Sequence, residues 1–333
     1  MKDVLIITGS YPPDICGVGD HTFNLMGTCA AQSWEMYYRK NWNIYTLFRH
    51  IRDIYSTGAN FIIMQYGTRG YGWSIVPHLL CIYYSWFTRK RFGVILHELS
   101  QLSLKAYIAE LLILISANKI MFTTQYERNF AIKRIPFIKS RSTVIKILSN
   151  IKASETICPI EKRNIDVAYF GQIMPLKGIE IFIRDTALLS SNIKIVIAGQ
   201  VPPMFVDFYN KIVNLCVQTN IQIITNLNQA EVSELLNNTK IVYLPFPDGV
   251  SERRGSLLAS IENGAVVLTT FGKFTTKEIE RATINVYENK IKDILNNKTL
   301  LEEKQKAAKI FFDTQMPHDW DEIAKSYQNF ITK

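Results

Sequence analysis

Short apolar runs alternate with stretches of helical spacing along most of the chain. Nearly continuous apolar runs are typical of parallel strands that are buried on both faces. The runs with this character are residues 3–8, 61–65, 94–97, 120–123, 143–147, 165–170, 193–198, 221–225, 241–244 and 265–270. Strands that alternate with helices in this way predict an α/β fold built on doubly wound parallel sheets.

The length of the chain and a break in its pattern predict two domains. The chain has 333 residues, of which 47% are hydrophobic, so it can bury more than one core. The alternation lapses over a polar stretch that contains Pro159. We therefore predict a first domain over residues 1–150, a linker over 151–164 and a second domain over 165–315. A final amphipathic helix follows over 316–333.

Two arginines precede a short helix in the segment FPDGVSERRGSLLASIENGAVVLTT, residues 246–270. The segment lies between two strand-like runs, so its loop falls at the carboxyl end of a buried strand, where open α/β sheets bind ligands. Arg253 and Arg254 stand beside the start of the helix at Gly255 and Ser256. Free N–H groups of a first helical turn attract anions, and arginines bind phosphate oxygens in pairs. The pattern predicts a phosphate-binding site.

Two acidic residues complete the predicted site. Asp248 belongs to a turn before the arginines, and Glu262 lies about two helical turns after Arg254. A carboxylate near the phosphates, but not touching them, can accept hydrogen bonds from ribose hydroxyls. We therefore interpret the segment as a binding site for a nucleoside diphosphate.

The second half of this segment resembles the donor-binding signature of glycosyltransferase family 4, whose members are retaining enzymes of the GT-B fold. Glu262, Gly264 and the strand AVVLTT match the end of the family's Glu-x7-Glu motif. Arg254 occupies the position of the first glutamate, which resembles a branch whose loop reads like DGxSxRRGSLL. The resemblance implies two Rossmann-like domains that face a cleft. It also implies transfer of a sugar from a nucleoside-diphosphate sugar with retention of configuration.

The second domain opens with the phrase GQIMPLKG, which resembles the family's GRLxxxKG. In that phrase an arginine and a lysine neutralise the leaving diphosphate. Lys177 keeps the lysine, Gln172 replaces the arginine, and Gly171 frees the backbone at the end of the strand. We infer that Arg253 or Arg254 restores the missing cation. Lys177 and Arg254 are therefore candidates for catalysis by stabilising charge on the leaving phosphate.

Further donor contacts are expected where other strands end. Gly17 and Gly19 follow the first strand in SYPPDICGVGDHT, which resembles the PPxxGGVGDYT opening of many GT-B amino-terminal domains. These glycines allow a close backbone approach to a ligand, and Asp20 is predicted as the N-cap of the next helix. Gly199 and Asn226 end strands of the second domain and are expected beside the nucleotide base.

His97 and Glu98 end another strand, in LHELS, and resemble the HE or HD at this place in family 4. By that resemblance His97 is the third catalytic candidate and contacts a hydroxyl of the donor sugar; otherwise it is a core histidine bonded to backbone. Glu98 either contacts the acceptor or caps the helix that begins at Leu104. Tyr66 and Arg69 belong to the glycine-rich loop YGTRGYG and are candidate acceptor contacts.

Charge is concentrated in the first half of the chain. Residues 1–150 hold 17 lysines and arginines and 8 acidic residues, whereas the remainder holds 21 of each. Aromatic side chains beside cations suit the interface of an anionic membrane. The alternative is a core helix that ends in a solvated basic cap, and nucleic acid ranks below both because no recognised motif is present. The two clusters are Tyr83, Tyr84, Trp86, Phe87, Arg89, Lys90 and Arg91, and Lys133, Arg134, Lys139 and Arg141.

Other features bear on location and packing. The five cysteines are scattered and the amino terminus lacks a secretory signal, so we expect a cytoplasmic protein at the inner face of the plasma membrane. The run 106–117 predicts a helix buried beneath a sheet. In GT-B enzymes the terminal helix often crosses back to the first domain, and Trp320 is a suitable anchor for that packing; the alternative is packing on its own domain.

The expected function is that of a retaining glycosyltransferase. Its predicted substrates are a nucleoside-diphosphate sugar and a glycan acceptor, lipid-linked because the first half is basic and aromatic, as in bacterial surface polysaccharide and O-antigen synthesis. No cofactor and no metal are expected, since lysine and arginine supply the positive charge. Two alternatives are a non-catalytic homologue that binds sugar nucleotides or acts as a scaffold, and a sugar-nucleotide epimerase of the same fold.

Overall fold

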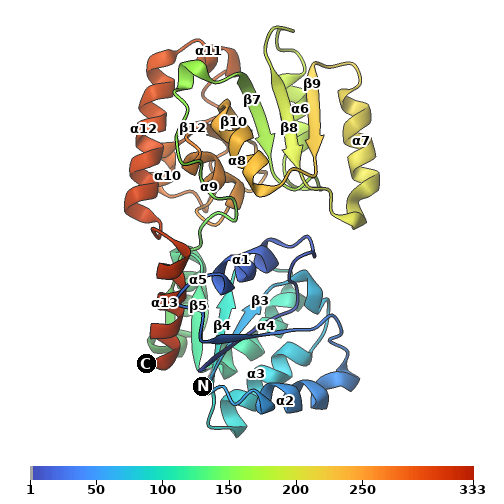
Figure 1. Ribbon diagram of the computed structural model, residues 1–333, viewed down its shortest axis with the longest axis vertical. Helices are drawn as coiled ribbons and strands as arrows, with labels where there is room; N and C mark the ends of the chain where they lie inside the picture. Colours follow the sequence, from blue (N-terminus) through green and yellow to red (C-terminus); the bar gives the residue numbers. More distant parts are fainter. Residues whose placement is uncertain (1–2) are drawn as a thin grey trace. The chain divides into compact units, whose positions relative to one another are not determined.

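The computed structural model describes residues 3–333, and the chain divides into two compact units (Figure 1). The first unit comprises the chain up to residue 148 together with residues 317–333, and the second comprises residues 149–316. Each unit has a parallel sheet with helices packed against it, so the predicted α/β fold of two doubly wound sheets is confirmed.

The first unit is built on a parallel sheet with the strand order β2-β1-β3-β4-β5-β6. Its strands are β1 (Val4–Thr8), β2 (Trp34–Tyr38), β3 (Phe61–Tyr66), β4 (Arg91–Leu96), β5 (Lys119–Phe122) and β6 (Ser142–Val144). Its helices are α1 (Gly17–Met26), η1 (Ile44–Thr46), α2 (Leu47–Ser56), η2 (Arg69–Tyr71), α3 (Val76–Phe87), α4 (Leu104–Ser116), α5 (Gln125–Arg134), η3 (Pro136–Arg141) and α13 (Trp320–Thr332).

The second unit has the strand order β12-β11-β10-β7-β8-β9. Its strands are β7 (Ile165–Phe170), β8 (Ile195–Gly199), β9 (Ile221–Thr225), β10 (Thr239–Leu244), β11 (Val266–Thr269) and β12 (Ile284–Asn285). Its helices are η4 (Ile160–Lys162), α6 (Ile179–Thr186), η5 (Pro203–Phe205), α7 (Val206–Cys216), α8 (Gln229–Asn237), α9 (Gly255–Glu262), α10 (Lys277–Ala282), α11 (Ile291–Leu295) and α12 (Lys298–Gln315).

Two edge strands have no counterpart among the predicted strands. β2 carries the sequence WEMYY, in which Glu35 and Met36 are only partly buried, so its run of apolar residues is interrupted. β12 is two residues long, too short to leave a pattern. Both strands lie at the edge of their sheets, where one side of the strand is not covered by a neighbour.

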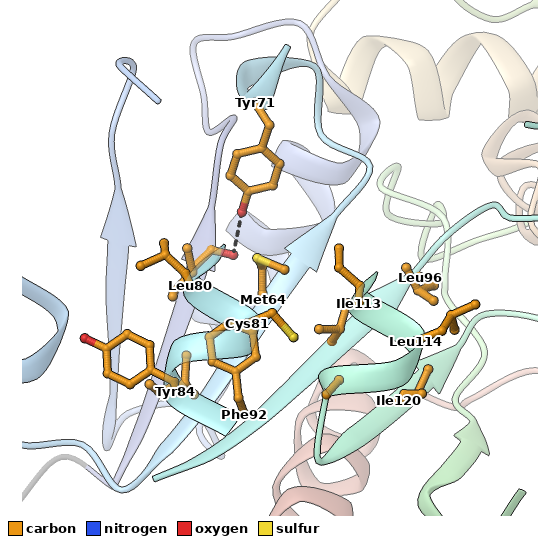
Figure 2. Close-up of a cluster of buried hydrophobic side chains, with 14 of the residues drawn as sticks. Met64, Tyr71, Leu80, Cys81, Tyr84, Phe92, Leu96, Ile113, Leu114 and Ile120 are labelled. Carbon is orange, nitrogen blue, oxygen red and sulfur yellow. Dashed lines mark hydrogen bonds between the residues drawn. The ribbon is translucent and has the colours of Figure 1, made fainter. Parts of the chain in front are cut away.

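The main core of the first unit lies between its sheet and helices α3 and α4, which cover the same face (Figure 2). Tyr84 on α3 lies against Phe92 on β4 with ring centroids 6.2 Å apart. The hydroxyl of Tyr84 donates to the carbonyl of Ile51 at 2.6 Å, which ties α3 to α2. Aromatic side chains of this size contribute most of the apolar area that such a core buries.

Helix α4, where the sequence predicted a helix buried beneath a sheet, is buried on one side only. Glu110, Ile113 and Leu114 face the core, but an apolar stripe faces solvent. The stripe consists of Leu104, Ile108, Leu112 and Ile115, which share one helix face because they are spaced by three or four residues.

The C-terminal helix α13 packs within the first unit. Tyr327 and Ile331 are fully buried, and the ring of Trp320 lies 4.9 Å from the ring of His21 on α1. The backbone N–H of Ala30 donates to Asp321 at 2.8 Å. Trp320 therefore contacts the amino-terminal part of the chain.

Most of the stretch predicted as a linker, residues 151–164, is bound to the second unit. Buried Arg163 donates to the carbonyls of Cys158, Leu236 and Thr239. Because burial disfavours its charged form, the pKa of Arg163 falls to about 10. The segment is thus attached to the sheet by a buried cation whose donors are met by backbone carbonyls.

Gly178 is the glycine on which the first loop of the second unit depends. It has φ +81°, and a Cβ at this position would lie 2.0 Å from the carbonyl oxygen of Pro245. Only glycine fits a left-handed residue pressed against backbone in this way. The contact joins the loop after β7 to the chain just after β10.

We therefore expect Gly178→Ala to lower the free energy of unfolding by about 1–3 kcal/mol, the usual cost of a left-handed non-glycine residue, and by more if the clash with Pro245 is not relieved. Gly255→Ala is the matched control, because a Cβ there meets nothing within 4 Å. Urea unfolding of both variants measures the difference. Equal stability of the two variants would contradict this account of the loop.

Candidate functional site

The loop after β10 is held in shape by its own backbone. Gly249 has φ +85°, and a Cβ there would lie 2.6 Å from the backbone of Gly272 in the loop after β11. The N–H of Val250 donates to the carbonyl of Thr270 at 2.9 Å, and the hydroxyl of Thr275 donates to the carbonyl of Val250 at 2.8 Å. The two loops thus form one rigid edge beside the start of α9.

The arginine pair is anchored on this edge. Nη2 of Arg254 donates to Asp248 Oδ1 at 2.6 Å, and its guanidinium lies 4.7 Å from the ring centroid of Phe246. The guanidinium of Arg253 lies 5.8 Å from the ring centroid of Phe274. Phe246 and the Asp248 carboxylate together restrict Arg254, so little of its side-chain freedom remains to be lost when a ligand binds.

Lys177 stands in a strained loop after β7. Leu176 before it has φ +65°, which is uncommon outside glycine and is concentrated at functional sites. The phenol of buried Tyr169 donates to the carbonyl of Lys177 at 3.3 Å. Burial raises the pKa of Tyr169, and the charge of Arg254 acts against that rise. Tyr169 is thus bonded to the loop that carries Lys177 and lies within electrostatic range of Arg254.

Helix α9 begins at Gly255 and Ser256, as predicted, with Arg254 at its N-cap position, and ends at Glu262. Burial raises the pKa of Glu262 to about 8. Its Oε2 is buried and has no hydrogen-bond partner among the described residues. We predicted an ionised carboxylate at this position. With a pKa of about 8, the carboxyl group of Glu262 is mainly protonated at pH 7 in the absence of a ligand. A buried oxygen without a partner costs free energy that a ligand hydroxyl can recover.

Other predicted donor contacts lie at strand ends of the second unit. Gly171 and Gly199 meet each other, since a Cβ on Gly199 would lie 1.8 Å from the carbonyl oxygen of Gly171. Gly199 therefore serves strand packing. Gln172 is partly exposed beside Gly171. Asn226 is exposed and has φ +62°, a left-handed conformation that asparagine adopts more readily than most residues.

His97 lies in the first unit, at the end of β4. Its Nε2 lies 3.0 Å from Oε1 of Gln65, a fully buried residue of β3. The ring of His21 lies 5.5 Å away, and burial together with the charge of His97 lowers the pKa of His21. His97 is therefore bonded to a side chain, whereas the core alternative expected a bond to backbone.

Helix α1 begins earlier than predicted. Its first residue is Gly17 and its N-cap is Cys16, so Asp20 lies inside the first turn and is not the cap. Burial raises the pKa of Asp20 to about 6. A Cβ on Gly19 would lie 3.1 Å from backbone of Ser10, so Gly19 makes room for the chain's own loop. Gly17 is exposed at the start of the helix.

The predicted acceptor residues are spread over two strand ends. Tyr66 donates to or accepts from Nε2 of His78 at 2.9 Å, and Arg69 is exposed in η2. Glu98 is exposed and does not cap α4, because the side chain of Ser103 accepts from the N–H of Ala106 at that end. Serine directly before the first helical residue is the stronger N-cap, and sequence proximity alone favoured Glu98.

Part of each predicted basic cluster is used by the fold. Tyr84 is fully buried, Lys90 donates to the carbonyl of Ala59, and Arg91 donates to carbonyls at the end of α13. Arg141 donates to Leu114 and Ile115 and so caps the end of α4. These contacts tie part of each cluster to the first unit itself. Trp86, Phe87, Arg89, Lys133 and Lys139 are exposed.

Sequence reasoning missed the residues that support the candidates. Gln65 and Tyr169 each lie within a buried strand and bond to a site residue: Oε1 of Gln65 meets the ring of His97, and the phenol of Tyr169 donates to the carbonyl of Lys177. A polar residue inside an apolar run is the signal that marks both. The pairing of Asp248 with Arg254 was also not predicted, although a six-residue loop brings the two within reach.

Comparison with known proteins finds solved structures of similar fold at low sequence identity. No family model matches the chain, and no curated protein matches its sequence. A glycosyltransferase from Rickettsia africae superposes with a TM-score of 0.70 at 12% identity, covering 100% of this chain and 99% of that one. HepE from Anabaena, solved with UDP and glucose, gives 0.69 at 14% identity with both chains fully covered, at 100% each.

An α-glucosyltransferase solved with UDP and a 13-mer DNA gives a TM-score of 0.63 at 13% identity, with 100% of each chain covered. These likenesses show the fold: the chain has the GT-B architecture, with two Rossmann-like units. Within residues 3–333, no helix combines the length and apolar character needed to cross a bilayer, and no cluster of three or more His, Cys, Asp or Glu is placed to hold a metal.

The raised pKa of Glu262 predicts a pH dependence of stability. The folded state holds the proton of Glu262 more tightly than the unfolded state does. The stability that this proton contributes is complete at pH values below the unfolded-state pKa and is lost as the pH rises through the folded-state pKa of about 8. We expect Glu262→Gln, which stays neutral, to lose less stability than the wild type between about pH 5 and pH 8. Urea unfolding across this range checks the prediction, and parallel curves for the two proteins would contradict it.

Proposed function

We propose that this protein is a retaining glycosyltransferase that takes its sugar from a nucleoside-diphosphate donor. The observation that carries the proposal is the arrangement after the neighbouring strands β7 and β10: Arg253 and Arg254 directly precede α9, and Tyr169 is bonded to the carbonyl of Lys177 and lies within electrostatic range of Arg254. Support comes from the shared fold with glycosyltransferases, two of which were solved with UDP. UDP is therefore the first donor nucleotide to test.

In the proposed mechanism the cations act on the leaving diphosphate. Lys177, Arg254 and the first N–H groups of α9 bind phosphate oxygens and stabilise the charge that develops there as the sugar–phosphate bond breaks. Glu262 receives ribose hydroxyls at its buried oxygen. We propose that the acceptor attacks from the face of the leaving group, which gives retention, and that the phosphate takes the acceptor proton. His97, held by Gln65, is proposed to bind a hydroxyl of the donor sugar.

The acceptor is proposed to be a lipid-linked glycan at an anionic membrane surface, as in bacterial surface polysaccharide or O-antigen synthesis. Support comes from the exposed apolar stripe of α4 and from exposed Trp86, Phe87, Lys133 and Lys139 in the same unit. Exposed apolar side chains accompanied by cations suit binding to an anionic bilayer. The fold alone does not select the acceptor, because one similar enzyme was solved with DNA.

A non-catalytic role as a sugar-nucleotide-binding scaffold is the second candidate. It is favoured by the ion pair between Asp248 and Arg254, which partly neutralises a cation of the proposed site. Transfer or slow donor hydrolysis that is lost in Lys177→Ala would exclude this role. Product analysis with the donor alone separates the transferase from an epimerase of the same fold.

Loss of one arginine should weaken nucleotide binding. We expect Arg254→Ala to raise the Kd for UDP about 10- to 100-fold, since hydrogen bonds to charged groups contribute about 1.5–3 kcal/mol. Arg254→Lys should recover only part of the affinity for UDP, because the ammonium group of lysine cannot bind two phosphate oxygens in one plane as a guanidinium does. Titration calorimetry measures both, with Arg184→Ala as the control for an exposed arginine of the same unit. An unchanged Kd in Arg254→Ala would refute the assignment.

The apolar stripe of α4 should be required for membrane binding. We expect flotation with anionic vesicles at low salt and weaker flotation at high salt, because salt screens the attraction. Ile108→Glu should abolish flotation, whereas Leu188→Glu, an exposed position in the second unit, should not change it. Flotation that is equal in these two variants would show that α4 does not face the bilayer.

A further inference from the structure

The first unit contains a cavity that the proposed donor site does not use. Its volume is about 560 Å³, and it lies between the loop after β2 and the loop after β3. Lys40 lines it from the first loop, and Arg69 and Trp73 line it from the second. Both loops follow the carboxyl ends of parallel strands, the usual place for ligand contacts in such a sheet. The volume is within the range of small-molecule sites.

The walls of the cavity are fixed by bonds within the chain. The hydroxyl of Ser74 donates to the carbonyl of Trp42 and so joins the two loops. The ring of Trp42 is stacked on His50 at 4.4 Å and meets Tyr71 edge-on at 4.7 Å. The floor is equally tight, because a Cβ on Gly70 would lie 1.6 Å from the carbonyl oxygen of Gly9. These contacts hold the bases of the two loops together in the absence of a ligand.

The lining combines positive charge with exposed apolar surface. Lys40 and Arg69 supply two cations, and none of the described residues that line the cavity is acidic. Trp73 is 94% exposed, and Ile44 and Ile75 are 46% and 40% exposed. Large apolar side chains gathered at a cavity are costly in water unless a ligand covers them. Two cations that line one cavity suit a group that carries two negative charges.

We propose that this cavity binds the phosphate or diphosphate of the acceptor, with Trp73 and the isoleucines covering the first part of an apolar chain attached to it. The proposal rests on the proposed glycosyltransferase function and names the chemical class of its acceptor: a phosphate ester of an apolar alcohol. Arg69 provides a planar pair of donors for two phosphate oxygens, and Lys40 provides a compact charge from the opposite loop. The indole of Trp73 offers a broad apolar face.

The test uses geranyl diphosphate, a water-soluble diphosphate with a short apolar chain, and titration calorimetry on the full chain. UDP is present at saturation so that the probe cannot occupy the donor site. We expect binding to the wild type and at least a tenfold loss in the double variant Lys40→Gln, Arg69→Gln. The matched control is Arg49→Gln with Arg52→Gln, which removes the same charge from exposed positions that do not line the cavity.

A second pair of measurements tests the apolar part. Trp73→Ala should weaken binding of geranyl diphosphate severalfold and leave the affinity for inorganic pyrophosphate unchanged, since only the chain contacts the indole. The proposal is overturned if the wild type binds geranyl diphosphate no better than pyrophosphate. It is also overturned if the control pair loses as much affinity as the cavity pair. UDP binding, measured in the same samples, tests the donor site separately from the cavity. If UDP does not bind, the geranyl diphosphate titrations are run without UDP and are judged by the same comparison of the cavity variant with the control variant.

Discussion

The candidate donor site depends on the contact between two segments, the loop after β7 and the first residues after β10. Gly178 lies against the carbonyl of Pro245, and no other residue type fits there. Tyr169 then fixes the carbonyl of Lys177, and the loop after β10 fixes Arg254 through Asp248 and Phe246. Parallel strands deliver their carboxyl ends to one edge of a sheet, so neighbouring strands bring cations from distant parts of the sequence together.

The site retains features that are unfavourable in the absence of a ligand. Leu176 has a left-handed backbone, and Glu262 holds a buried oxygen without a partner among the described residues. Each costs free energy that the surrounding fold must offset. Strained and unsatisfied groups of this kind are concentrated where proteins bind ligands, so they support the proposal more strongly than the shared fold does.

The sequence predicted the sheets well because buried parallel strands leave continuous apolar runs. It did not predict β2, whose run is broken by Glu35, nor the true start of α1, where Cys16 and not Asp20 is the N-cap. Local patterns also predicted the segment around Arg254 and the start of α9 at Gly255. They could not predict the partners, since the bond between Gln65 and His97 joins residues 32 positions apart. Which cations the fold itself uses, such as Arg141, depends equally on tertiary packing.

Hydrogen–deuterium exchange with and without UDP tests the central claim most directly, because it locates the ligand on the chain. The account predicts that saturating UDP slows exchange in two segments, the loop around Lys177 at residues 171–178 and the segment from Phe246 to Glu262. Slower exchange confined to other segments, or no change at any UDP concentration, would contradict it.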